Sequence, residues 1–152
     1  MTFTYGVLLF FFGLVLLAAL TGMMFRPGVW YASLNKPAWT PPNWMFPVVW
    51  TVLYVMIAIA GWLVWSAVGF GPLLWLWFAQ LALNMAWSWI FFGRKNMALG
   101  FVDILLLMAL IIAFIIISAI VVPMASFLFM PYLAWVMLAA ALNFSIWRLN
   151  TG

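Results

Sequence analysis

The stretch MALGFVDILLLMALIIAFIIISAIVV, residues Met97–Val122, decides the fold of this chain. It contains one charged residue, Asp103, and it exceeds the roughly 20 apolar residues that cross the hydrocarbon core of a bilayer. A strand alone in lipid would leave its backbone N–H and C=O groups without partners, whereas a helix satisfies them internally. The stretch therefore predicts a transmembrane helix.

The rest of the chain has the same character. Of its 152 residues, 72% are hydrophobic and 4% are charged, and the mean hydropathy is +1.32. A soluble domain carries about a quarter charged residues, so this chain could not cover a folded surface in water. Proline, glycine and charged residues divide it into five predicted spans. These are Tyr5–Phe25, Phe46–Ala67, Leu73–Phe92, Met97–Val122 and Ala125–Trp147.

The fold class that follows is an all-α integral membrane protein. We expect a single transmembrane domain over residues 1–152, a bundle of five helices with a structured first loop. The run Tyr5–Phe25 lacks the basic n-region of a signal peptide and is longer than a usual h-region. We therefore expect it to be retained as the first helix.

The basic residues predict the orientation of this bundle. With five crossings, the first loop, the third loop and the C-terminus share one side of the membrane. All five basic residues fall on that side, which the positive-inside rule makes cytoplasmic, with the N-terminus outside. A basic cytoplasmic face favours the cytoplasmic membrane over an outer membrane. The residues are Arg26, Lys36, Arg94, Lys95 and Arg148.

The first loop, residues 26–45, is the only connection long enough to have a structure of its own. Its continuation into the second span, NKPAWTPPNWMFPVVW (Asn35–Trp50), contains four prolines and three tryptophans. Proline presets the backbone and limits the entropy lost on ordering, so the loop suits a rigid lid over a pocket. Lys36 could meet a ligand carboxylate there, or serve only as a positive-inside lysine.

Polar residues inside the spans fall on helical stripes, at intervals of three or four residues. On each of three spans, a stripe places an aromatic ring beside a hydrogen-bonding or small residue. The amides could serve only to join helices, at about 0.6 kcal/mol each. Together the stripes favour a cavity with apolar walls and a few polar groups, which suits a flat, hydrophobic ligand. The stripes are Trp50, Tyr54, Ile57 and Gly61; Gln80, Asn84, Trp87 and Phe91; and Tyr132, Trp135, Ala139 and Asn143.

The chemistry of the chain excludes several classes of site. It has no histidine, no cysteine and one acidic residue, so zinc and iron–sulfur sites are not expected. Neither a carboxylate pair for acid–base catalysis nor a Ser-His-Asp triad can be assembled. We predict no metal site, no catalytic residue, no required cofactor and no nucleic-acid partner. A haem would lack its usual axial ligand, so a tetrapyrrole ligand would fit better in its metal-free form.

Two further features concern single helices. Asp103 is expected about two turns into its span, and the simplest interpretation is a structural pair with Arg94, Lys95 or Arg148. A proton relay would need a second titratable partner of the same kind. Small residues at Ala79, Ala82 and Ala86 lie on a face away from the Asn84 stripe, and such steps let helices approach closely. They predict a homodimer through the third span.

Four blocks of this sequence resemble one known family. WYASLNKPAWTPPNWMFPVVWTVLYVM (Trp30–Met56) is similar to the most specific block of the tryptophan-rich sensory protein family, also called the translocator protein or peripheral benzodiazepine receptor family. The blocks AQLALNMAWSWIFFG (Ala79–Gly93), VDILLL (Val102–Leu107) and PYLAWVMLAAALNFSIWRLN (Pro131–Asn150) follow in the same order. The resemblance covers nearly the whole chain and agrees with five spans.

The resemblance implies a five-helix, usually dimeric membrane receptor or sensor that binds porphyrins such as protoporphyrin IX. The pocket it implies lies between the helices beneath the first loop, with Trp50 and Trp135 as stacking walls and Asn84 as a polar contact. The positions of this chain that match the family's binding residues largely coincide with the stripes. They are Trp30, Tyr31, Pro41, Trp50, Tyr54, Asn84, Trp87, Phe91, Trp135, Ala139 and Asn143.

The family's sterol motif is incomplete here. It calls for Leu or Val, then Tyr, then Lys or Arg, and the corresponding residues are Leu142, Phe144 and Arg148, with phenylalanine in place of tyrosine. Because such motifs are weak evidence even when complete, sterol binding is not favoured.

Two alternative functions stay open. The first is facilitated movement of porphyrins or other amphiphiles across the bilayer, without a nucleotide site or an ion-coupling carboxylate to drive it. The second is breakdown of porphyrin in light and oxygen, with Trp50 or Trp135 forming a radical; this is the one enzyme-like role that the resemblance allows.

Overall fold

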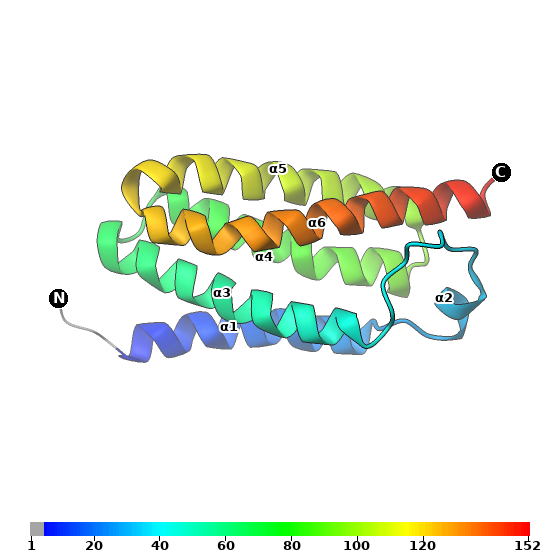
Figure 1. Cartoon of the computed structure of the whole chain (residues 1–152). Helices are drawn as coiled ribbons and strands as arrows, with labels where there is room; N and C mark the ends of the chain where they lie inside the picture. Colours follow the sequence, from blue (N-terminus) through cyan, green and yellow to red (C-terminus); the bar gives the residue numbers. More distant parts are fainter. Residues whose placement is uncertain (1–4) are drawn as a thin grey trace.

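The computed structural model describes residues 5–152 and confirms the all-helical prediction (Figure 1). No strand occurs in that range. Five of its helices are long and apolar enough to cross a membrane, as predicted. They are α1 (Tyr5–Met24), α3 (Met45–Val68), α4 (Pro72–Ser88) continued by the π-helical turn η1 (Trp89–Gly93), α5 (Met97–Val121) and α6 (Pro123–Asn150).

Local sequence explains where these helices begin and end. Pro72 and Pro123 occupy the first turns of α4 and α6, where a missing N–H costs no hydrogen bond. Gly69 closes α3 with a φ of 69°, a left-handed conformation that glycine adopts without strain. Asn96 caps α5 by accepting a hydrogen bond from the Leu99 N–H at 2.9 Å. The predicted spans were therefore correct to within a few residues.

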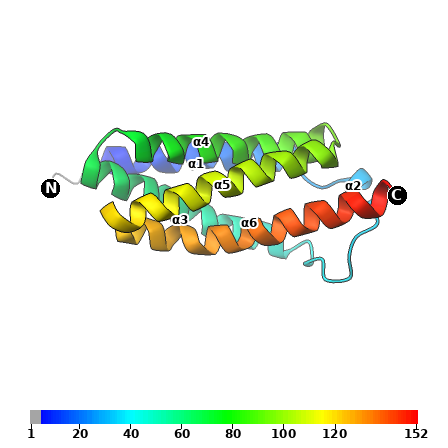
Figure 2. The same ribbon diagram turned by 90° about the horizontal axis from the view of Figure 1, so that it is seen from above.

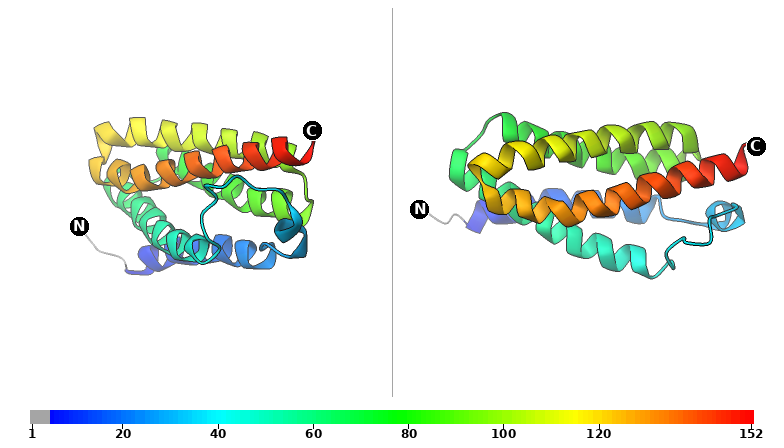
Figure 3. Two further views of the ribbon diagram at one scale, coloured as in Figure 1. Left: turned by 45° about the vertical axis from the view of Figure 1, so that its right-hand side comes forward. Right: turned by 45° about the horizontal axis from the view of Figure 1, so that its top comes forward.

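The helices form one elongated bundle. α5 packs against α4 and α6, α1 packs against α3 and α4, and α3 also packs against α6. Figures 2 and 3 show that the first loop and the C-terminus lie at one end, while the described chain begins at the other. The five basic residues lie at the loop end, since they follow α1, occupy the loops there or belong to the last turn of α6. Which side of the membrane this end faces stays a prediction.

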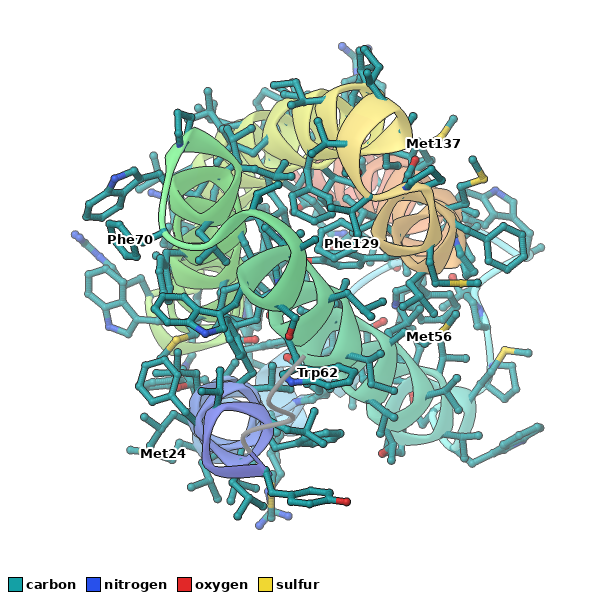
Figure 4. All side chains as sticks on the ribbon, turned by 90° about the vertical axis from the view of Figure 1, so that its left-hand side faces the viewer. Met24, Met56, Trp62, Phe70, Phe129 and Met137 are labelled. Carbon is teal, nitrogen blue, oxygen red and sulfur yellow. The ribbon has the colours of Figure 1, made fainter. Side chains whose placement is uncertain are left out.

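Large aromatic side chains fill the bundle. Phe129 lies inside it, with its ring stacked on Phe114 at a centroid distance of 4.0 Å (Figure 4). Trp77 is fully buried, packs edge-on against Phe11 at 4.9 Å, and donates its indole N–H to the Ile57 carbonyl at 2.9 Å. That hydrogen bond satisfies the indole without water, which the hydrocarbon region lacks.

Close packing at this point requires a glycine. A Cβ atom added at Gly61 would lie 2.7 Å from ring atoms of both Phe11 and Trp77. We expect Gly61→Ala to destabilise the protein by about 1–3 kcal/mol, because two buried rings must move. The measurement is unfolding of the detergent-solubilised protein by titration with sodium dodecyl sulfate.

Gly13→Ala is the matched control, because a Cβ at Gly13 has no atom within 4 Å. It should be neutral or slightly stabilising, since alanine favours a helix over glycine. Equal losses in the two variants would contradict the packing argument.

Candidate ligand-binding site

A groove of about 500 Å³ lies between α3 and α6. Met56, which lines it, lies on the outer side of the bundle between these helices (Figure 4). Pro131 interrupts the hydrogen-bond ladder of α6 at the groove because it has no N–H to donate. The walls are Val48, Val49, Val52, Leu53 and Met56 from α3, and Pro131, Ala134, Trp135 and Leu138 from α6.

Trp135 is the one residue of the groove wall whose side chain carries an N–H group. Its ring is half-buried and packs edge-on against Phe46 of α3, at a centroid distance of 5.6 Å. Its Nε1 atom is buried and has no hydrogen-bond acceptor among residues 5–152. A buried donor without a partner is costly, so a ligand that brought an acceptor to this atom would gain free energy.

A chain of hydrogen bonds lies on the inner side of α3 and connects three helices. The Tyr54 hydroxyl donates to Asn84 Oδ1 at 2.9 Å, and Asn84 Nδ2 donates to the Tyr132 hydroxyl at 2.9 Å. The Tyr132 hydroxyl in turn donates to Gln80 Oε1 at 2.8 Å. Trp50 covers this chain, since it stacks on Tyr54 at 5.3 Å and meets the Tyr132 ring edge-on at 6.2 Å.

Both side-chain polar atoms of Asn84 are therefore engaged by tyrosines. Tyr54 belongs to α3 and Tyr132 to α6, so the Asn84 amide joins α4 to two neighbouring helices. This is the helix-joining role that the sequence left open for the amides. Asn84 is 6% exposed, and Gln80 and Tyr132 are fully buried. A direct polar contact between Asn84 and a ligand stays a prediction.

A second group of predicted site residues lies nearer the loop. Trp87 stacks on Phe91 at 5.0 Å and donates its indole N–H to Asn143 Oδ1 at 3.0 Å. Asn143 Nδ2 donates to the carbonyl of the first residue of α5 at 2.8 Å. Trp30 and Tyr31 meet Phe91 edge-on at 5.8 and 6.5 Å. These side chains fasten the loop to the bundle.

The structure thus distributes the predicted residues over three neighbouring places. Trp135 lines the groove. The second place holds the hydrogen-bonded Tyr54 and Asn84, with Trp50 stacked on Tyr54. The remaining aromatic residues and Asn143 lie under the loop. Ala139 packs against the core, and Pro41 is half-buried within the loop. Whether one ligand contacts all three places stays a prediction.

The first loop is ordered by its own polar contacts. It contains a short helix, α2 (Val29–Ser33), which was not predicted from the sequence. Lys36 Nζ donates to the carbonyls of Tyr31 at 2.8 Å and Leu34 at 3.1 Å, and lies 4.6 Å from the Tyr31 ring centroid. Burial raises the pKa of the Tyr31 hydroxyl above its ordinary value, so Lys36 lies over a neutral ring. The lysine therefore has a structural role in the loop.

Two asparagines fasten the loop to α6. Asn150 Oδ1 accepts from the Asn35 N–H at 3.0 Å, and Asn150 Nδ2 donates to the Asn35 carbonyl at 2.9 Å. These residues are far apart in sequence, so the reciprocal pair fixes the loop against the end of the last helix. We call this pair the Asn35–Asn150 clamp.

The sequence match to known proteins covers almost the whole of this architecture. The model of the TspO/MBR family matches residues 7–148. The chain belongs to this family. A relative called protein CrtK from Rhodobacter capsulatus is 42% identical over 139 residues, covering 89% of this chain and 87% of its own length. The tryptophan-rich protein TspO of Chlorobaculum tepidum is 41% identical, with 91% of this chain and 92% of the relative covered.

The family also extends to animals. The human translocator protein is 41% identical over 129 residues, which cover 81% of this chain and 76% of the human protein. The family resemblance drawn from the four sequence blocks is therefore confirmed. A relative from Cereibacter sphaeroides, 39% identical over 132 residues, is called a tryptophan-rich sensory protein, and none of these names is that of an enzyme.

One expectation for this TspO/MBR member was wrong. Asp103 was expected to pair with Arg94, Lys95 or Arg148, but its buried Oδ2 atom has no hydrogen-bond partner in the described chain. The reason is the direction in which the side chains point. Asp103 is 6% exposed and turned into the bundle. Arg94 is exposed, and its guanidinium lies 5.4 Å from the Trp89 ring centroid. The carboxyl group and the basic groups face opposite ways.

The sterol-like residues and the small residues can also be placed. Leu142 is 6% exposed and packs in the cluster under the loop, whereas Phe144 and Arg148 are exposed on another face of α6. The three residues therefore do not share one face. Ala79 and Ala82 are exposed on the surface of α4 and Ala86 is partly exposed, so the stripe is accessible; the homodimer stays a prediction.

Two parts of the site were missed from the sequence. Tyr132 and Gln80 were placed on the correct stripes but not assigned to the site, although their helical spacing to Trp135 and Asn84 carried the signal. The aliphatic groove walls carried no such signal, because valine, leucine and alanine at these positions are typical of any transmembrane helix.

The hydrogen-bonded chain predicts unequal effects of two tyrosine variants. Tyr132→Phe removes two interhelical bonds and Tyr54→Phe removes one. At about 0.6 kcal/mol per bond in membrane proteins, the loss should be about 1 kcal/mol for Tyr132→Phe and about half of that for Tyr54→Phe. The free energy of unfolding in detergent measures both, and equal losses would contradict the central place of Tyr132.

The Asn35–Asn150 clamp predicts a change confined to the loop. Asn150→Ala should speed hydrogen–deuterium exchange across residues 34–44, above all at the Asn35 amide, which loses its acceptor. Asn43→Ala is the control, since Asn43 is exposed in the same loop and its side chain makes no hydrogen bond in the described chain. If exchange is unchanged in Asn150→Ala, the clamp does not hold the loop.

Proposed function

We propose that this TspO/MBR family member is a membrane receptor for a flat, hydrophobic ligand. A porphyrin such as protoporphyrin IX, in its metal-free form, suits the site best, and the groove between α3 and α6 is where we place it. The observation that carries the proposal is Trp135, whose ring lines an apolar groove near the loop and whose buried indole N–H has no acceptor within residues 5–152.

The dimensions and chemistry of the groove support this class of ligand. Its volume of about 500 Å³ falls within the range of small-molecule sites, which are mostly apolar and have a few orienting polar groups. Aliphatic walls offer contact to a macrocycle, and a turn of the Trp135 ring would bring its buried N–H to a ring nitrogen or a carboxylate of the ligand. Trp50 lies next to the groove on α3. It stacks on Tyr54, which the hydrogen bond to Asn84 holds in place.

The position of the loop supports a sensing role. Phe46, which packs on Trp135, follows the loop directly and is the second residue of α3. A ligand that moved Trp135 would therefore press on the loop's junction with α3. The sensory and translocator names of the relatives agree with a receptor of this kind.

Facilitated movement of an amphiphile is the second candidate function. The observation in its favour is that the groove lies on the outer side of the bundle, where Val48 and Val52 are 54% and 55% exposed. A hydrophobic ligand could reach it from the bilayer. Counterflow of labelled protoporphyrin in proteoliposomes tests this, and a flux no higher than in protein-free liposomes would rule it out.

The receptor proposal predicts a specific effect of Trp135→Phe. This change keeps an aromatic wall but removes the indole N–H, so affinity for protoporphyrin IX should fall roughly three- to tenfold, the effect of one hydrogen bond. The measurement is quenching of tryptophan fluorescence in a titration of the detergent-solubilised protein. Trp75→Phe is the control, since Trp75 is 61% exposed on α4 and does not line the groove.

Each result decides the question. Saturable binding that Trp135→Phe weakens and Trp75→Phe leaves unchanged supports the groove as the site. Quenching that never saturates, or that falls equally in both variants, means that the porphyrin partitions into the apolar surface and that the proposal is wrong.

A further inference from the structure

A second concavity lies at the loop end of α6, nearer the C-terminus of that helix than the groove. Its volume is about 610 Å³, and it shares no lining residue with the groove. Its walls come from the first loop and the last two turns of α6. They are Pro37, Phe144, Ser145, Arg148 and Leu149.

Two polar side chains in this concavity have no partner. Ser145 and Arg148 are three residues apart on α6 and so share one face of the helix. Neither side chain makes a hydrogen bond within residues 5–152. Thr151, by contrast, donates its hydroxyl proton to the Trp147 carbonyl at 2.7 Å, as hydroxyls in helices often do. A free hydroxyl and a free guanidinium thus border one space.

Arg148 differs in this respect from basic residues near it. Lys36 is held by two carbonyls and the Tyr31 ring, and Arg94 lies over the Trp89 ring. The guanidinium of Arg148 keeps its donors for a ligand. Its planar fork matches the oxygen atoms of a phosphate group, with which it forms paired hydrogen bonds.

The end of α6 is prepared for an anion in another way. The free carbonyls in the last turn of a helix repel negative charge. Here Asn150 Nδ2 donates to the Ile146 carbonyl at 2.7 Å, and the Thr151 hydroxyl covers the Trp147 carbonyl. Side-chain donors therefore cover two carbonyls near the end of α6, which reduces this repulsion beside Arg148.

Apolar walls complete the concavity. Phe144 is 42% exposed and Leu149 is 50% exposed. Phe144 packs with Phe101 at 5.2 Å and with Trp147 at 6.2 Å, so aromatic rings gather where α6 leaves the hydrocarbon region. Aromatic residues at this depth are typical of the membrane interface. A ligand with an anionic head and apolar chains fits both parts of this surface.

We propose that this concavity binds the headgroup of one anionic phospholipid from the leaflet at the basic end of the bundle. The Arg148 guanidinium donates to the phosphate oxygens and the Ser145 hydroxyl donates to the same group. Phe144 and Leu149 contact the glycerol and the first part of the acyl chains. All five basic residues lie at this end, which attracts anionic lipids to it.

The site also touches the loop. Pro37 forms one wall, and the Asn35–Asn150 clamp lies beside it. A bound lipid would contact Pro37, which is near Asn35, and Leu149, which is next to Asn150. It would therefore favour the position of the loop seen here.

The test is native mass spectrometry of the detergent-solubilised full chain, titrated with phosphatidylglycerol or with phosphatidylcholine and without porphyrin. We expect one saturable phosphatidylglycerol complex that forms in preference to the phosphatidylcholine complex. Arg148→Gln should weaken it about fivefold, the effect of one basic residue at an anionic leaflet. Ser145→Ala should weaken it in the same direction by less.

Arg94→Gln is the matched control, because Arg94 lies at the same end but not in the concavity. If it weakens phosphatidylglycerol binding as much as Arg148→Gln, the attraction is diffuse and the proposal fails. Equal binding of the two lipids, or displacement of the lipid by inorganic phosphate, would also overturn it. Because no porphyrin is present, failure of the receptor proposal would leave this result unchanged.

Discussion

A polar side chain inside a bilayer has no water to bond with, and this constraint governs the whole structure. The hydrogen bonds from Tyr54 through Asn84 and Tyr132 to Gln80, of 2.8–2.9 Å, cross from α3 to α4 to α6 and meet this constraint except at Gln80 Nε2, which has no partner in the described residues. Apolar contacts alone would let helices slide, because lipid tails are as apolar as leucine. The hydrogen-bonded chain fixes the relative positions of three helices and therefore places Trp50.

The two proposed sites follow from how α6 is used. Its inner face joins the hydrogen-bonded chain, one outer face meets α3 at the groove, and its last turns meet the loop. Pro131 removes one backbone hydrogen bond at the groove, and Asn150 caps the C-terminal end while it clamps the loop. One helix therefore contributes residues to the groove between α3 and α6, to the contacts of the loop and to the concavity at its own C-terminal end.

The sequence allowed the fold to be predicted almost completely. A segment that crosses a bilayer must be a long apolar helix, so apolar runs, prolines at helix starts and charged residues between the runs mark the spans. The stripes through Asn84 and Trp135 also identified the inward faces. The direction in which a side chain points could not be predicted in the same way. Asp103 was expected to meet a basic residue, yet nothing in the spacing shows that Arg94 turns outward over Trp89. The groove was missed because its walls are ordinary aliphatic residues, and only their arrangement around Trp135 makes a site.

The division of labour between Asn84 and Trp135 follows from the same constraint. The Asn84 amide is engaged by two tyrosines, so loosening it would weaken the bundle. An indole N–H that no protein group accepts is a cost in the unliganded protein and a gain in the bound one. The free energy for recognition is therefore available at Trp135, while Asn84 keeps the wall behind it in place. Under the receptor proposal, a ligand would be recognised beside the loop while the hydrogen-bonded residues keep the helices behind it in place.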